Sequence, residues 1–77
     1  MLFVITYDVD TTDVQGAKRL RKVAKLCERN GMRVQNSVFE VLVDAAQWMV
    51  LKEELSKTID HEHDSIRCYR LGNSYQH

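Results

Sequence analysis

A run of strand-forming residues at the start of the chain, Leu2 to Tyr7, most constrains how this protein can fold. Its β-branched and aromatic side chains follow one another with almost no polar interruption, which is typical of a central strand covered on at least one face. The run passes directly into Asp8, Val9 and Asp10. We therefore expect Asp8 to stand where the chain leaves the sheet, fixed in position by the strand and reachable from solvent.

An amphipathic helix is predicted from about residue 14 to about residue 30, with Gly31 ending it. Its N-cap can be Thr11, Thr12 or Asp13. Apolar residues recur at helical spacing and form one stripe, made of Ala17, Leu20, Val23, Ala24 and Cys27. At about 100° per residue, basic residues gather on the opposite side, namely Lys18, Arg21, Lys22, Lys25 and Arg29, with Arg19 on one flank.

The rest of the chain supplies two or three further strands and a second helix. The β-rich segment Met32 to Val43 predicts two strands joined by a tight turn near Asn36, or alternatively one long strand with a bulge. A helix from about Ala45 to Asp60 follows, with Trp48, Leu51, Leu55 and Ile59 on one face. The final segment "SIRCYRL" has the pattern of a last strand.

The order βαββαβ over residues 1–77 predicts a single α+β domain of the ferredoxin-like sandwich type. In that fold two helices cover one face of a four-stranded antiparallel sheet. Nothing else in the chain is available for the other face, which must be polar or meet a partner. With only 77 residues the core is thin, which favours a homodimer.

Charge and cysteine content narrow the surroundings in which the protein works. The chain is neutral overall, but residues 1–37 carry seven Lys or Arg against four Asp or Glu, whereas residues 38–77 carry four against seven. This asymmetry indicates an anionic partner for one face. Cys27 and Cys68 look like small core residues in a reducing compartment. The first apolar run is too short for a signal peptide or membrane span, so we expect a cytoplasmic protein with no membrane contact.

Asp8 is the first candidate for chemistry. A carboxylate at the end of a central strand suits a hard cation such as Mg²⁺, which takes one or two carboxylates together with water and substrate phosphate. The alternative is that Asp8 and Asp10 merely end the strand and cap the loop. Glu40 and Asp44 are expected to face solvent. If two copies bring their first strands together, two Asp8 carboxylates can share one ion.

The basic helix is the second candidate, because a ridge of Lys and Arg can follow a phosphate backbone. Residues 18–29 contain six cations and only one anion, Glu28, whereas ordinary solvent faces mix both signs. A plain solvated helix face is the alternative. His61 and His63 have a spacing that can ligate a metal, but without a third ligand they are better interpreted as a solvated turn.

Taken together, "ITYDV", "KRLRKVAKLCERNGMRVQNSVFEVLV" and "DSIRCYRLGN" resemble, in the right order, the CRISPR-associated protein 2 family from about residue 2 to residue 74. The resemblance implies a symmetric homodimer through the sheet faces, with Asp8 of each copy near the two-fold axis and one Mg²⁺ shared between them. Tyr7 and Asp8 match the strand-end pair and would be the catalytic residues. Members typically continue into a tail that adds a strand to the partner's sheet, and this chain, which stops at His77, is expected to lack it.

The same resemblance implies one of two functions. The first is a Mg²⁺-dependent endonuclease on single-stranded RNA or double-stranded DNA that takes part in integrating new spacer DNA into the CRISPR array in antiviral defence. The second is a non-catalytic DNA-binding dimer that bridges the CRISPR integrase subunits. Matched positions and the helical projection assign nucleic-acid binding to Lys18, Arg19, Arg21, Lys22, Lys25, Arg33 and Phe39. A small-molecule-sensing regulator is disfavoured, since the chain has no Gly-rich ligand loop.

Overall fold

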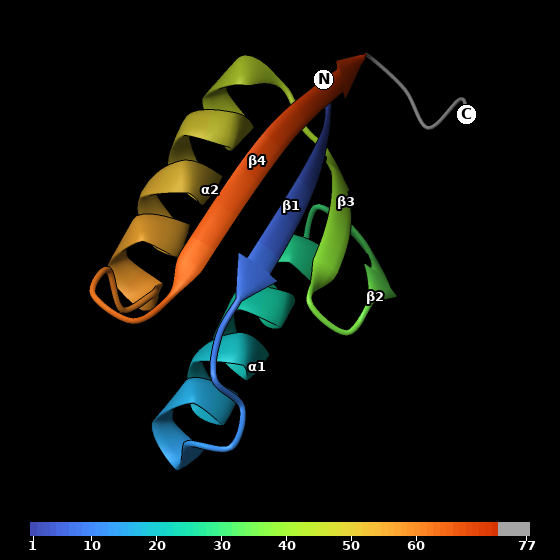
Figure 1. Cartoon of the computed structure of the whole chain (residues 1–77). Coiled ribbons are helices and arrows are strands. Elements are labelled where there is room, and N and C mark those ends of the chain that lie inside the picture. Colours follow the sequence, from blue (N-terminus) through green and yellow to red (C-terminus); the bar gives the residue numbers. More distant parts are fainter. Residues whose placement is uncertain (73–77) are drawn as a thin grey trace.

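Six elements follow one another in a computed structural model that describes residues 1–72 (Figure 1). They are β1 (Leu2–Asp8), α1 (Val14–Glu28), β2 (Gly31–Gln35), β3 (Val38–Leu42), α2 (Ala45–Thr58) and β4 (Ser65–Gly72). The predicted βαββαβ order is therefore confirmed. The last two residues of the family-like segment and the end of the chain at His77 lie outside the described residues.

The strands form one antiparallel sheet in the order β2-β3-β1-β4, so β1 is a central strand, as its apolar run predicted. Ile5 of β1 lies opposite Phe39 of β3 and Cys68 of β4. Both helices pack on the same face, and no element of residues 1–72 covers the other face, called the uncovered face below (Figure 1). This is the predicted ferredoxin-like arrangement. No helix within residues 1–72 is long and apolar enough to cross a membrane.

Alternation along β1 sends Phe3, Ile5 and Tyr7 toward the helices, and these side chains build the core. The helices complete it with buried side chains that sequence periodicity had singled out, namely Leu20, Val23, Ala24, Cys27, Leu51 and Leu55. Trp48, on the same predicted helix face as Leu51 and Leu55, packs against the core and stacks on Phe3 with ring centroids 3.7 Å apart. Ala17 is the exception in the predicted stripe, because it is only partly buried while Gly16 is fully buried.

The end of α1 differs from the prediction. The helix stops at Glu28, and Gly31 opens β2 instead of ending the helix. A side chain at residue 31 would overlap the backbone carbonyl of Glu40, so glycine is needed here for close approach of β2 to β3. The start of α1 is capped by Asp13, one of the three candidates, whose carboxylate accepts a hydrogen bond from the Gln15 N–H at 3.1 Å.

The β2–β3 hairpin turns at Asn36 and Ser37, as one of the two sequence readings predicted. Its register also shifts between Arg33 and Gln35, so the hairpin contains an irregularity as well. The second helix starts on a capping box in which Asp44 and Gln47 bond reciprocally. It ends at Thr58, two residues before the predicted Asp60, because Ile59 adopts an extended backbone with ψ 160°.

Candidate active site at the end of β1

The last two residues of β1 point to opposite faces of the sheet. Tyr7 lies on the helix face, where its side chain is buried, opposite Ile66 of β4. Asp8 is exposed on the uncovered face, opposite Ser65. Consecutive side chains in a strand always separate in this way. The predicted catalytic pair therefore does not share one site, and any contribution of Tyr7 to chemistry at Asp8 must be indirect.

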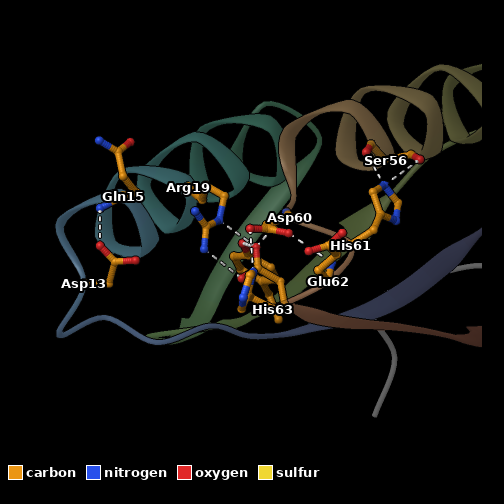
Figure 2. A network of polar contacts seen from close by, with 10 residues as sticks. Asp13, Gln15, Arg19, Ser56, Asp60, His61, Glu62 and His63 are labelled. Atoms are coloured by element: carbon orange, nitrogen blue, oxygen red, sulfur yellow. Dashed lines mark hydrogen bonds and ion pairs between the residues drawn. The ribbon is translucent and has the colours of Figure 1, made fainter.

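On the helix face, Tyr7 belongs to a polar cluster centred on Asp64. Its hydroxyl donates a hydrogen bond to the Asp64 carboxylate. Arg19 donates to both carboxylate oxygens, from Nε to Oδ2 at 2.8 Å and from Nη2 to Oδ1 at 3.0 Å. The backbone N–H of Asp60 adds a further bond at 2.9 Å. Figure 2 shows Arg19 reaching from its helix toward the loop that holds Asp60 and His63.

The protonation states of this cluster follow from its contacts. Burial, together with the bond to Asp64, raises the pKa of Tyr7 to about 12. Burial alone would raise the pKa of Asp64, but the hydrogen bonds from Arg19 and Tyr7 prevail and lower it to about 2. The pKa of Arg19 is raised, mainly by its bond to Asp64. Near neutral pH the cluster is a fixed brace of a phenol, a carboxylate and a guanidinium, not a proton shuttle.

On the uncovered face, Asp8 opens into a shallow hollow of about 320 Å³, lined by Thr6, Asp8, Ser65, Arg67 and Tyr69. The Asp8 carboxylate makes no hydrogen bond or ion pair with another residue of the described range 1–72. Within that range no group of three or more metal-ligating side chains comes together. A single free carboxylate fits a hard cation that retains most of its water, and suits a site completed by a second copy.

Neighbouring acids are occupied elsewhere. Asp10 accepts hydrogen bonds from the Thr12 N–H at 3.0 Å and the Thr12 hydroxyl at 2.6 Å, and its pKa is lowered by these bonds. Asp44 caps α2. The sequence alone allows a capping role for both Asp8 and Asp10. Among the described residues, Asp10 has this role, whereas Asp8 does not.

The basic face of α1 is largely as predicted. Lys18, Arg21, Lys22 and Lys25 are exposed on its outer side. Arg29 is also exposed, with Nη1 lying 3.8 Å from the Glu54 carboxylate. Arg19 departs from this surface, because its guanidinium turns inward to Asp64 and its side chain is only 19% exposed. Arg19 thus supports the fold, and its predicted contact with nucleic acid competes with that ion pair.

Phe39 requires a correction. Its side chain is fully buried on β3 within the core, so it cannot stack on or touch a nucleic acid in this fold. Arg33 covers the ring with its guanidinium carbon 5.7 Å from the centroid. The same guanidinium donates to the Asn36 carbonyl at 2.8 and 2.6 Å. Arg33 remains exposed and available to a ligand, whereas the role of Phe39 is packing.

The histidine pair lies in the turn between α2 and β4 and faces in two directions (Figure 2). The His61 ring nitrogen lies 2.7 Å from the carbonyl oxygen of Ser56, and His63 Nδ1 lies 2.9 Å from the Asp60 carboxylate. Both side chains are exposed. The turn interpretation of "HEHD" is therefore confirmed.

Sequence reasoning missed two residues, Asp64 and Arg67. In the sequence, Asp64 is one of several acids that follow the second helix. Its hydrogen-bond partners, Tyr7 and Arg19, are 57 and 45 residues away. No local pattern reports such a contact. Arg67 did carry a usable signal, since alternation from Ile66 and Cys68 places it on the sheet face opposite the helices.

The fold and the site define a class: small ferredoxin-like domains that present one acidic strand end on an open sheet face. The family model described as CRISPR associated protein Cas2 matches residues 1–77. The chain accordingly belongs to the Cas2 family, as its motifs predicted.

Individual relatives agree. The chain is 60% identical over 76 residues to a CRISPR-associated endonuclease Cas2 of Halalkalibacterium halodurans, with 99% of this chain and 79% of that protein covered. It is 52% identical to a CRISPR-associated endoribonuclease Cas2 3 of Rhodospirillum rubrum, covering 97% and 79%. The crystal structure of Streptococcus pyogenes Cas2 at pH 6.5 superposes with a TM-score of 0.92 at 53% identity, covering 94% of this chain and 87% of that one.

Proposed function

We propose that this protein is a nuclease that hydrolyses phosphodiester bonds with the help of a Mg²⁺ ion bound at Asp8. One observation carries the proposal: Asp8 is a carboxylate fixed at a strand end with no partner among the described residues, while the nearby acids Asp10 and Asp64 are engaged. The names of the relatives, endonuclease and endoribonuclease, support the same reaction.

One carboxylate per chain favours a site shared by two copies. Large apolar side chains are exposed on the same uncovered face, among them Met32, Leu42 and Tyr69 at 39–47% exposure. Burying them against a second sheet would be favourable, and a two-fold axis near the end of β1 would bring two Asp8 carboxylates to one ion. We therefore propose a homodimer through the sheet faces.

Within this site, Asp8 would hold the cation, and the rigid strand would keep the carboxylate in place. When bound, Mg²⁺ supplies Lewis-acid activation of the phosphate and an activated water. Behind the sheet, the bonds from Tyr7 and Arg19 to Asp64 join β1, α1 and the start of β4, so they stiffen the two strands that flank Asp8. The exposed cations of α1 would hold the backbone of the nucleic acid.

Family membership supports a place for this activity in the integration of new spacer DNA into the CRISPR array, with a CRISPR integrase subunit as partner and the cytoplasm as location. RNA and DNA both remain candidate substrates, because the names of the relatives include endoribonuclease as well as endonuclease.

Substitution of Asp8 tests the enzymatic proposal. Asp8→Ala should lower Mg²⁺-dependent cleavage by at least about 10²-fold, since it removes the proposed ion ligand at the reacting centre. Initial rates over a Mg²⁺ titration, on single-stranded RNA and on duplex DNA, give the measurement. Duplex affinity should stay nearly unchanged. Asp10→Ala is the matched control, because Asp10 only caps a loop. Cleavage that persists in Asp8→Ala would indicate a contaminating nuclease and reject the proposal.

A second candidate function, a non-catalytic duplex-binding dimer that bridges integrase subunits, is favoured by the single-sign basic surface of α1. Lys18→Glu with Lys22→Glu should weaken duplex binding and lower the slope of log affinity against log salt by about 0.9 for each lost phosphate contact. Binding curves at several salt concentrations measure both quantities. Lys52→Glu with Lys57→Glu on α2 is the control of equal charge change. Spacer acquisition that is normal in Asp8→Ala but lost in the α1 variant would favour this candidate over the nuclease.

A further inference from the structure

Arg67 is a cation placed in the same hollow as Asp8. Arg67 lies on β4 opposite Thr6 of β1, and Asp8 of β1 lies opposite Ser65 of β4. Asp8 and Arg67 are therefore diagonal neighbours on one face. Such neighbours have Cα atoms about 7–8 Å apart, with Cβ atoms somewhat closer. Both residues line the 320 Å³ hollow on the uncovered face of the sheet. A carboxylate and a guanidinium therefore border one small polar space.

The Arg67 guanidinium has no protein acceptor within the described part of the chain. It makes no ion pair or side-chain hydrogen bond with any residue of the range 1–72, Asp8 included. Two other arginines are engaged: Arg19 bonds Asp64, and Arg33 bonds Asn36. Arg70 also lacks an ion pair with any residue of the range 1–72, but it lies opposite Phe3, on the helix face. Of the arginines on the strands, only Arg67 is both unpaired and beside Asp8.

We propose that Arg67 contacts the phosphate being cleaved, and that it binds non-bridging phosphate oxygens while Asp8 holds the cation on the other side. This inference rests on the proposed nuclease function and adds a substrate-contacting residue to it. The planar guanidinium offers paired N–H donors that match two oxygens of one phosphate. A diagonal separation of about 7–8 Å between the Cα atoms of Asp8 and Arg67 leaves room for a phosphate between the two side-chain ends. The added negative charge of the transition state would strengthen the contact.

The arrangement also explains why an arginine is tolerated on a sheet face that is otherwise rich in apolar side chains. If that face packs against a second copy, an unpaired guanidinium would be costly there unless an anion met it. The phosphate of the substrate is such an anion. In a dimer, the partner's Asp8 carboxylate is a second anion that could meet the Arg67 guanidinium. The experiment below distinguishes the substrate phosphate from that carboxylate.

Arg67→Gln is the main variant, and Arg70→Gln is the matched control on the other face of the same strand. With saturating Mg²⁺, Arg67→Gln should lower kcat for a defined oligonucleotide by about 10²-fold, the scale for removing one donor to a developing oxyanion. Mn²⁺ affinity, measured by competition without any substrate, should remain within about twofold of wild type. The Arg70→Gln rate should be unchanged.

Chemical rescue supplies a readout that a structural role would not move. Millimolar guanidinium ion should restore part of the cleavage by Arg67→Ala and none of the cleavage by Asp8→Ala. Dimer dissociation, followed by sedimentation, should not change in Arg67→Gln.

A wild-type rate in Arg67→Gln, alongside a dead Asp8→Ala, would overturn the role of Arg67 and leave the nuclease standing. Loss of the dimer in Arg67→Gln, with no rescue by guanidinium, would assign Arg67 to the subunit interface instead. A wild-type rate in Asp8→Ala would reject the nuclease itself.

Discussion

At the end of β1, neighbouring polar residues of the described chain are hydrogen-bonded within the fold on one face of the sheet and unpaired on the other face. On the helix face, Tyr7 is buried and its hydroxyl is tied to Asp64, which Arg19 also binds. On the uncovered face, Asp8 lies beside Arg67 with neither side chain paired inside the described chain. The consecutive residues Tyr7 and Asp8 therefore differ completely: Tyr7 belongs to a buried hydrogen-bonded cluster, and Asp8 is exposed and unpaired in the part of the chain that the structure describes.

This contrast separates residues that stabilise the small domain from residues that are open to a ligand. A polar group that is buried must find its partner within the fold, because leaving it unpaired costs free energy. A polar group at an open face can stay unpaired within the fold because water solvates it, and it remains accessible to a ligand. Tyr7, Arg19 and Asp64 thus hold the strands together, whereas Asp8 and Arg67 are unpaired within residues 1–72 and are the residues that we propose for binding.

The largest expected effect comes from comparing aromatic residues on the two faces. Phe39→Ala should destabilise the protein by about 3–5 kcal/mol, since its buried ring fills the core. Tyr69→Ala, on the open face at 47% exposure, should cost less than about 1 kcal/mol in dilute monomer. Urea unfolding at low protein concentration measures both free energies of unfolding. Equal losses of unfolding free energy in the two variants would contradict the contrast between the faces. If Phe39→Ala does not fold, Phe39→Leu replaces it.

A smaller effect is expected from the two aspartates. Asp64→Asn weakens the bond to Arg19 and should cost about 2 kcal/mol after allowance for solvent screening at the rim of the core. Asp8→Asn should change the free energy of unfolding by less than about 0.5 kcal/mol, because Asp8 has no partner to lose. Thermal unfolding of both variants tests this pair. A larger loss in Asp8→Asn than in Asp64→Asn would mean that the roles are reversed.

The smallest effect is a dependence on acid. The pKa of Asp64 is about 2 in the folded protein against an ordinary value of 3.8, so its stabilising contribution is present above about pH 4 and is lost as the pH falls toward 2. Asp10 and Asp60, whose pKa values are also lowered, add to the same slope. The free energy of unfolding from pH 5 to pH 2 should fall less steeply in Asp64→Asn than in wild type. Identical slopes would show that Asp64 does not carry the dependence.

Much of the fold could be predicted because its signals are local. The run Leu2 to Tyr7 identified a central strand, and helical spacing identified the buried stripe around Leu20 and Cys27. Gly31 was misassigned, since its role depends on how close the Glu40 backbone comes, and a sequence does not report that distance. Arg19 was assigned to the basic surface for the same reason, as its partner lies 45 residues away.

Element order, family and the candidate role of Asp8 follow from the sequence alone, because periodicity and motif order are properties of neighbouring residues. The tertiary contacts were needed to show that Tyr7 and Asp8 lie on different faces, that Phe39 is core, that Asp64 bonds Tyr7, and that Arg67 lies beside Asp8. The physical reason is that burial and pairing depend on contacts between distant segments. Those contacts exist only once the helices have closed one face of the sheet and left the other open.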